Sequence, residues 1–144
     1  MPRFSAGIAL AICAFIAAGC DSHPKVVKVS GQVLIDGQPL RHGFIQIVPD
    51  GQRAAMAKLD NEGRFTLSTD PNKTDDGVAP GTHRVAVIGL ETLDAGSQRW
   101  NAPKKYSTVE ESGLTVTIDK AMNDLTVNLP WAGGKPFIEY AGKD

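Results

Sequence analysis

This chain of 144 residues has few cysteines, few aromatic residues and no excess of charge, and these shortages exclude several classes of protein. Only two cysteines are present, which excludes a disulfide-rich secreted scaffold. Fifteen lysines and arginines stand against 16 aspartates and glutamates, which excludes the basic surface that electrostatic nucleic-acid binding requires. A chain of this length also has room for only one compact domain.

The chain also lacks any helical repeat of apolar residues after its first 20 positions. Its 15 glycines and 9 prolines would fit disorder, but an apolar fraction of 42%, arranged with a period of two, favours a turn-rich β domain. We therefore expect an all-β protein.

The first 19 residues have the three parts of a secretory signal. Arg3 is the only charge, an apolar run covers residues 8–18, and small residues end the segment. The run is shorter than the roughly 20 apolar residues that a membrane-spanning helix needs. Residues 1–19 are therefore predicted to be a signal peptide, and the protein is predicted to be exported.

A cysteine follows this leader directly, and Ala17-Ala18-Gly19-Cys20 resembles the lipobox of bacterial lipoproteins. In that family the leader is cut before the cysteine, and the thiol is acylated with fatty acids such as palmitate. The resemblance implies that Cys20 is the lipidation site and that acyl chains anchor the protein to a bacterial membrane, on its periplasmic or cell-surface side. Cys13 would leave with the leader, and residues 20–28 would form a polar tether.

The stretch 29–50 carries two strand patterns. Apolar residues recur at every second position in 29–35 and again in 44–48, and the turn formers Asp36 and Gly37 lie between the two runs. This pattern predicts a β-hairpin. Its apolar face needs further strands to cover it, because an isolated hairpin is marginally stable in water.

Five more segments have strand patterns, so the fold class predicted for residues 29–131 is a seven-stranded antiparallel β-sandwich. The five segments are residues 54–59, 64–69, 82–89, 114–118 and 125–129. The segments 54–59 and 64–69, separated by the turn 60–63, are expected to form a second hairpin. The predicted core residues are Val33, Ile35, Ile45, Ile47, Phe65, Leu67, Val85, Val87, Leu114, Val116, Leu125 and Val127.

Three segments lack a period. Residues 70–80 are polar and are predicted to be a surface loop. Residues 91–112 are the longest predicted irregular connection, and such a connection commonly crosses between sheets or carries function. The Gly-rich residues 132–144 are predicted to be a flexible C-terminal tail.

Several motifs, in their order and spacing, resemble the carboxypeptidase regulatory-like domain, and in particular the single-domain lipoproteins of this type in planctomycete-like bacteria. The resemblance covers residues 28–129. It implies a transthyretin-like, or prealbumin-like, β-sandwich and no catalytic residue. The motifs are Gly31-x-Val33-x-x-Asp36-Gly37-x-Pro39-Leu40, Ile45-x-Ile47-x-Pro49, Asp60-x-x-Gly63-Arg64-Phe65, Pro80-Gly81 with Val85-x-Val87, and Pro103-x-Lys105-Tyr106 with Ser112-Gly113-Leu114.

No residues group as catalytic machinery in the sequence. His23, His42 and His83 fall on the tether, a turn and a strand, whereas catalysis needs groups of matched pKa held together. The transthyretin-like hydrolases of purine breakdown share the implied fold, but their Tyr-Arg-Gly-Ser ending is replaced here by YAGKD, at 140–144. We expect a noncatalytic protein without a cofactor, with His83 as a partly exposed strand residue.

Acidic residues in 60–76 leave two interpretations open. The first is a turn in which Asp60 accepts backbone hydrogen bonds and Gly63 takes a positive φ. The second is a calcium site, but calcium needs six or more oxygen ligands, and no EF-hand series is present. The turn is favoured, and no metal site is predicted.

Trp100, Tyr106 and Trp131 are candidate ligand-binding residues, because each joins an apolar ring to a polar edge. Alternatively, Tyr106 and Trp131 close the ends of the sandwich. The first function hypothesis is a noncatalytic membrane-anchored module for interaction or envelope structure, with membrane lipid and an envelope protein or glycan as partners. The second is a surface lipoprotein that binds carbohydrate or peptide through the 91–112 loop.

Overall fold

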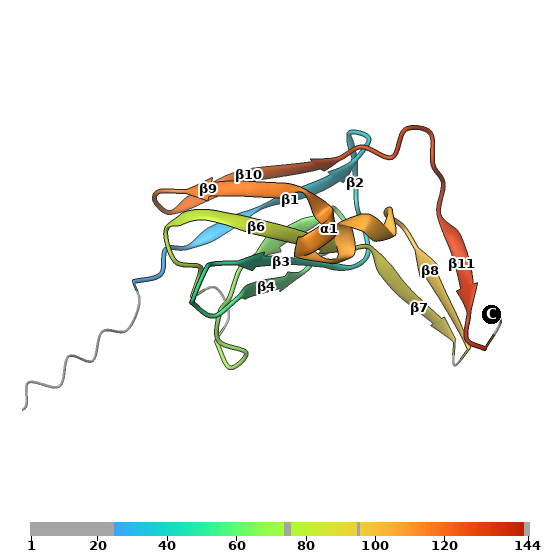
Figure 1. Ribbon diagram of the computed structural model, residues 1–144, viewed down its shortest axis with the longest axis horizontal. Coiled ribbons are helices and arrows are strands. Elements are labelled where there is room, and N and C mark those ends of the chain that lie inside the picture. The colour runs from blue at the N-terminus through green and yellow to red at the C-terminus, as the bar shows by residue number, and fades with distance from the viewer. Residues whose placement is uncertain (1–24, 74–75, 95, 143–144) are drawn as a thin grey trace, which may run out of the picture.

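The computed structural model describes residues 25–73, 76–94 and 96–142, and there the chain is mostly β, with several sheets and one short α-helix (Figure 1). The all-β prediction is confirmed at this level. In the same part of the chain, no helix has the length and apolar character needed to cross a membrane.

The first sheet is built around β1 (Val29–Ile35). This strand pairs with β10 (Met122–Leu129) on one side and with β2 (Gln38–Pro39) and β5 (Arg64–Thr66) on the other. The β1–β10 pair is parallel, so the prediction that all strands are antiparallel is wrong for this pair. Parallel neighbours need a long connection between them, and here the chain builds the second sheet before it returns.

The second sheet is antiparallel throughout and has the order β4 (Ala55–Lys58), β3 (Phe44–Val48), β6 (Gly81–Ile88), β9 (Leu114–Ile118). Because β1 and β3 belong to different sheets, the predicted first hairpin is wrong. The segment between them is a corner that leads from one sheet to the other. A period of two shows which face of a strand is buried, but it does not show which strand lies beside it.

The predicted second hairpin is also divided between the two sheets. β4 pairs with β3 and β5 pairs with β1, so only an isolated bridge joins the two segments. In this bridge Met56 and Ser68 exchange two backbone hydrogen bonds, of 2.9 and 3.1 Å.

One hydrophobic cluster draws side chains from both sheets and forms the core. All twelve predicted core residues belong to it, eight of them buried and four partly buried. The partly buried ones are Ile35, Leu114, Val116 and Leu125. Residues that the sequence pattern did not indicate also join the core, among them Leu40 and Val78 from connections between strands.

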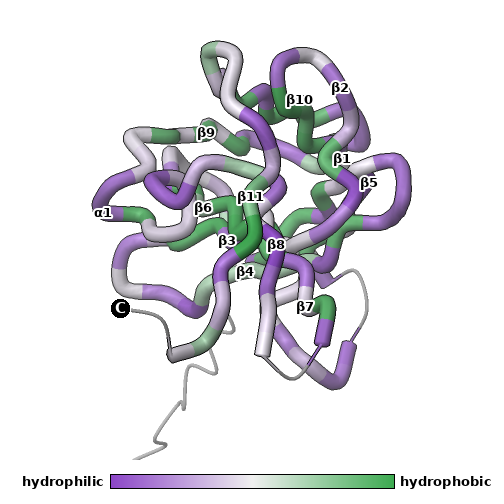
Figure 2. The backbone as a smooth tube through the Cα atoms, turned by 90° about the vertical axis from the view of Figure 1, so that its right-hand side faces the viewer, coloured by the Kyte–Doolittle hydropathy of each residue, from purple (hydrophilic) through white to green (hydrophobic). Residues whose placement is uncertain are grey.

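A third sheet, which we call the arm, consists of β7 (Leu90–Asp94), β8 (Ser97–Trp100) and β11 (Phe137–Tyr140), with β8 in the centre. It lies at one end of the molecule, and Figure 2 views the molecule from this end, with apolar residues of β11 in front. Two predictions fail here. The 91–112 connection is not irregular, and part of the 132–144 tail is a paired strand.

These strands escaped prediction because each has only four or five residues, too few to show a clear period of two, and because glycine-rich segments flank β11. The central strand, with the sequence SQRW, shows no clear alternation, and β11 pairs with it from about 40 residues further along the chain. Two short helical segments follow the arm, η1 (Lys104–Ser107) and α1 (Val109–Ser112), where no helix was expected.

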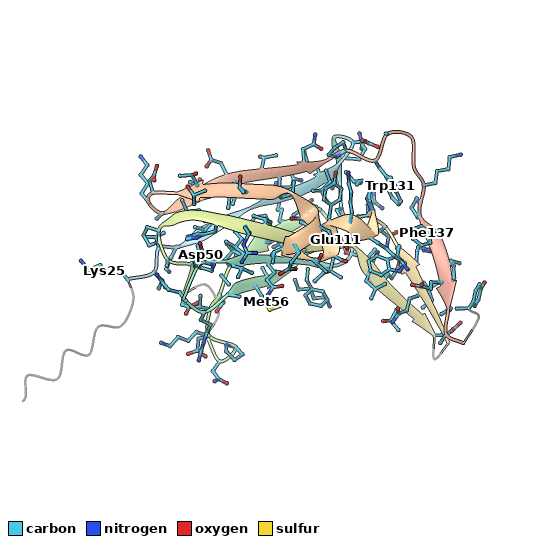
Figure 3. The ribbon with its side chains drawn as sticks, viewed as in Figure 1. Lys25, Asp50, Met56, Glu111, Trp131 and Phe137 are labelled. Carbon is cyan, nitrogen blue, oxygen red and sulfur yellow. The ribbon has the colours of Figure 1, made fainter. Side chains whose placement is uncertain are left out.

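The predicted tether enters the domain earlier than expected. Val27 and Val78 exchange two backbone hydrogen bonds, of 2.9 and 3.0 Å, so pairing begins before residue 29. Lys25 lies at one end of the molecule, whereas Trp131 and Phe137 lie toward the other (Figure 3). The described chain therefore enters at the end opposite to the arm.

Candidate functional site

A cleft of about 410 Å³ lies where the turn between β1 and β2 meets the arm and the segment after β10. We refer to it as the cleft. Its apolar lining includes Ile35 and Leu40, and its polar lining comes both from the segment 36–42 and from the arm. Small-molecule sites in proteins have volumes of about 300–1,000 Å³ and combine an apolar lining with a few convergent polar groups, so the cleft has a size and a composition suited to a ligand.

Trp131 forms one part of the lining, and two contacts hold it there. Its backbone N–H donates a hydrogen bond of 2.9 Å to Oδ1 of Asp36, in the β1–β2 turn. Gly134 packs directly against the indole ring, so that a Cβ atom at this position would overlap Cδ1 and Nε1 of the ring. The chain reverses between the two residues through a hydrogen bond of 2.9 Å from the Gly134 N–H to the Trp131 carbonyl.

Glu91 is the centre of the polar lining. Its Oε2 lies 3.4 Å from Nη1 of Arg99 and 3.3 Å from Nδ2 of Asn101, and its Oε1 lies 3.8 Å from Nε2 of His42. Glu91 and Arg99 are direct neighbours across the β7–β8 pair. These contacts are longer than the 2.9–3.0 Å of a typical N–H···O hydrogen bond, so the carboxylate keeps much of its capacity to accept further bonds.

The structure separates the three predicted ligand-binding residues. Tyr106 is buried in the core, and its hydroxyl donates a hydrogen bond of 3.2 Å to the Pro130 carbonyl. Trp131 is half-buried in the cleft. Trp100 lies on the arm next to Arg99, and successive residues of a strand point to opposite faces, so its side chain does not line the cleft.

Trp100 instead belongs to a polar group on the outer face of the arm. Its Nε1 donates a hydrogen bond of 2.8 Å to Oε2 of Glu139, and Lys104 Nζ lies 2.7 Å from Oε1 of the same carboxylate and 5.1 Å from the centre of the indole ring. The hydrogen bonds from Lys104 and Trp100 lower the pKa of Glu139. This group joins β8 to β11 and η1, which is a structural task.

Glu91, Arg99, Asn101 and His42 were not singled out from the sequence. A signal was present, since Asp94 and Gly96 are turn formers between two short segments, and a hairpin across them brings Glu91 opposite Arg99. The position of His42 had no such signal, because it follows from the corner between the first two sheets.

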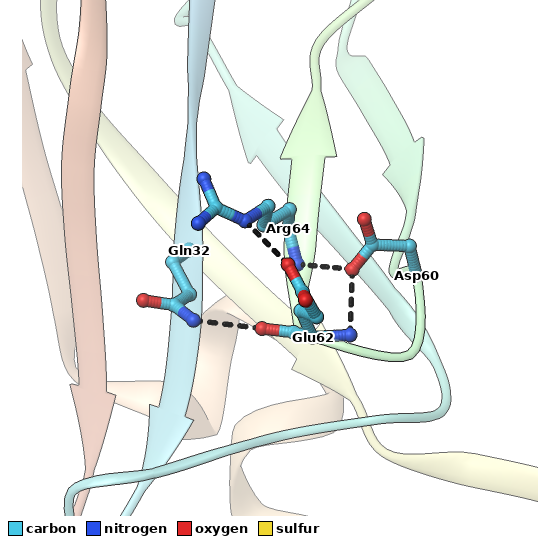
Figure 4. Close-up of polar contacts among 4 residues, drawn as sticks. All are labelled: Gln32, Asp60, Glu62 and Arg64. Atoms are coloured by element: carbon cyan, nitrogen blue, oxygen red, sulfur yellow. Dashed lines mark hydrogen bonds and ion pairs between the residues drawn. The ribbon is translucent and has the colours of Figure 1, made fainter.

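The turn 60–63 has the geometry of the favoured interpretation (Figure 4). Oδ1 of Asp60 accepts hydrogen bonds of 2.8 Å from the N–H groups of both Glu62 and Arg64, and Gly63 has a φ of 72°. The Glu62 side chain pairs with Arg64 at 2.9 Å. In the described ranges, no three His, Cys, Asp or Glu side chains gather in a way that could hold a metal ion.

Asp76 has the largest change in pKa among the acidic residues of this region that the structure describes. Its partial burial raises the pKa, but hydrogen bonds from the Thr69 and Ser68 hydroxyls and from the Thr69 N–H outweigh this effect and lower it to about 2. The Asp76 carboxylate thus binds Ser68 and Thr69, which follow β5 in the chain.

His83 is buried, not partly exposed, and its Nε2 lies 2.6 Å from the Ala79 carbonyl, while Nδ1 has no hydrogen-bond partner. Gly81 leaves room for this ring, because a Cβ there would approach His83 Cε1 to 2.9 Å. Cys20, the predicted lipidation site, lies outside the described residues.

Comparison with protein-family models, with curated proteins and with solved structures finds no match to this chain.

Proposed function

We propose that this chain is a noncatalytic, exported lipoprotein, anchored to a bacterial membrane through acylated Cys20, that presents a binding end away from the bilayer. One observation carries the proposal. The chain enters the described domain at one end, near Lys25, and the arm and Trp131 lie toward the opposite end (Figures 1 and 3). Trp131 lines the cleft, so the cleft is also at this end. An anchor at the first end leaves the second facing outward.

The tether supports this orientation. Val27 is already paired with Val78, so only six residues separate it from Cys20. At about 3.3 Å per residue they reach at most roughly 20 Å, which holds the entry end close to the membrane surface. Two or more acyl chains, each contributing about 0.8 kcal/mol per buried CH₂, would keep the anchor in place.

The arm supports a role in binding. It exposes Leu93, Phe137 and Ile138, each with about 40% of its surface accessible, and none of them contributes to the core. The proposed fold is a transthyretin-like sandwich, in which the seven strands predicted from the sequence divide between the two facing sheets and the arm is an addition.

Mass spectrometry of the mature N-terminal peptide tests the anchor. We expect a peptide that begins at Cys20 and carries acyl mass, and a Cys20→Ser protein that is released in soluble form or left as uncut precursor. High salt should not release the wild type, because screening weakens ionic contacts and leaves acyl burial intact. An unmodified Cys20 in envelope-located protein would contradict the proposal.

A second experiment tests the orientation. A fluorescent label is placed on the anchored protein at Lys120→Cys, in the β9–β10 connection beside the entry point, or at Ile138→Cys on the arm. Both positions are exposed, so each accepts the label. A quencher located in the lipid should reduce the fluorescence at 120 much more than at 138. Equal quenching at the two positions would show that the arm does not point away from the membrane.

A further inference from the structure

We propose that the cleft binds a neutral saccharide, with Trp131 stacking on the sugar ring and with Glu91, Arg99 and Asn101 bonding its hydroxyl groups. This inference rests on the proposed binding role and names the ligand of the outward end. It moves the predicted carbohydrate site from the 91–112 loop as a whole to the cleft, where only part of that loop takes part.

The charges of the lining argue for a neutral ligand. Two carboxylates, Asp36 and Glu91, and two guanidinium groups, Arg41 and Arg99, line the cleft, so their charges balance. An anionic ligand such as a phosphate would be repelled by one pair as much as it is attracted by the other. A neutral ligand with many hydroxyl groups gains hydrogen bonds from both kinds of side chain without a net electrostatic cost.

The geometry of the polar groups in the cleft suits a ligand that carries hydroxyl groups on neighbouring carbon atoms. Glu91, Arg99 and Asn101 have planar ends, each able to make two parallel hydrogen bonds, as neighbouring hydroxyls of a sugar require. Their contacts with one another are 3.3–3.4 Å long, so little is lost when a ligand replaces them. Hydrogen bonds to a charged partner are stronger than those between neutral groups, so Glu91 and Arg99 are the stronger polar anchors and Asn101 the weaker one.

Trp131 supplies the apolar side of the site. A sugar ring has an apolar face made of its C–H groups, and the indole is a broad surface for such a face. The residue is held before any ligand arrives, by the Asp36 carboxylate at its backbone and by Gly134 against its ring. A fixed ring reduces the entropy that binding would otherwise cost.

The main chain around the cleft argues against an extended peptide. Peptides that add to a sheet use the free hydrogen-bonding groups of an edge strand. Of the strands that line the cleft, β1 and β8 are central strands with neighbours on both sides, whereas β7 and the two-residue β2 are edge strands. Pro39 and Pro136, which also line it, have no N–H group to offer.

The test uses the full-length protein, extracted in a detergent without a sugar headgroup. Immobilised oligosaccharides of neutral hexoses, pentoses and N-acetylhexosamines are screened beside uronate oligosaccharides and peptides. Hits are then titrated in solution by tryptophan fluorescence. The chain has only two tryptophans, so a Trp100→Phe variant reports on Trp131 alone. We expect a neutral glycan to shift this fluorescence with a saturating titration.

Two variants with the same change locate the site. Glu91→Gln keeps the size of the side chain but removes its charge, and it should weaken glycan binding about tenfold or more. Glu139→Gln makes the same change on the outer face of the arm and should leave the affinity unchanged. Trp131→Ala should abolish the binding that Trp100→Ala retains.

Three results would overturn the inference: no neutral glycan binds the wild type, the bound glycan is indifferent to Glu91→Gln, or only uronates or peptides bind in the cleft. The acyl analysis and the quenching experiment do not depend on any ligand. If they succeed while the glycan screen fails, the saccharide inference falls and the anchored binding module remains.

Discussion

Asp36 and Trp131 lie 95 residues apart in the chain, and the carboxylate of the first accepts a hydrogen bond of 2.9 Å from the backbone N–H of the second. Asp36 also donates its own N–H to the Leu129 carbonyl at 3.0 Å, so the parallel β1–β10 pairing continues past the last paired residues. Its φ of 46° places it in the left-handed region, which Asp tolerates better than most residues. This one residue shapes the turn and positions the indole of the cleft.

Asp36→Ala is expected to lower the free energy of unfolding by about 1–3 kcal/mol, because a hydrogen bond to a charged group is lost and the left-handed φ becomes less favourable. Trp131 should also become more mobile, which fluorescence anisotropy in a Trp100→Phe background measures. Asp36→Asn is the control, since it keeps an acceptor oxygen and tolerates the same φ. Equal loss in both variants would mean that the hydrogen bond does not position Trp131.

Ile47→Ala is expected to lower the free energy of unfolding by about 2–5 kcal/mol, because Ile47 is fully buried between the sheets and its removal leaves a cavity. Thr115→Ala, on the exposed face of β9, should change it by no more than about 0.5 kcal/mol. Urea melts of both variants measure the difference. Similar midpoints for the two would show that the buried and exposed faces are wrongly assigned.

The pKa of Asp76 is lowered to about 2 in the folded protein, so this group stabilises the fold above the pKa of an unfolded aspartate and loses that effect as the pH falls from about 4 toward 2. At pH 7, Asp76→Asn should therefore be less stable than the wild type by about 1–2 kcal/mol. The difference should shrink toward zero near pH 2. Urea melts between pH 2.5 and pH 7 measure it, and a constant difference would contradict the assignment.

The arm is expected to open without unfolding of the two core sheets, since it is small and contributes little to the core. Amides of β11 should exchange with solvent deuterium faster than those of β1, and Glu139→Ala should accelerate exchange in β11 alone, because it removes the contacts to Trp100 and Lys104. Glu62→Ala, an exposed carboxylate away from the arm, is the control. Uniform acceleration over all sheets would mean that the arm and core unfold as one unit.

The sequence predicted the buried residues well and their neighbours poorly. Val33, Ile47 and Val87 were placed in the core from period-two alternation, and all three are buried. The same pattern led to a hairpin of the strands at 29–35 and 44–48, which in fact belong to different sheets. Alternation is a property of a single strand, and it is the same whether the next strand pairs beside it or faces it across the core.

The candidate site was less predictable than the fold. Trp131 was identified because of its chemistry, and the structure places it in the cleft. Tyr106 has the same chemistry, but it is buried, and Trp100 points to the outer face of the arm. Glu91 and Arg99 were missed because charged residues in short segments without a clear alternation resemble those of any exposed loop.

By itself, the sequence determined the β class and the inward-facing residues of the two core sheets, because alternation and turn chemistry are local properties. Only the tertiary structure decided the parallel β1–β10 pair, the arm and the cleft. Each of these depends on the meeting of segments far apart in the chain, such as Asp36 with Trp131 and Trp100 with Glu139. The first contact joins the segments that follow β1 and β10, and the second joins β8 to β11 within the arm, so no local pattern in the sequence indicates either of them.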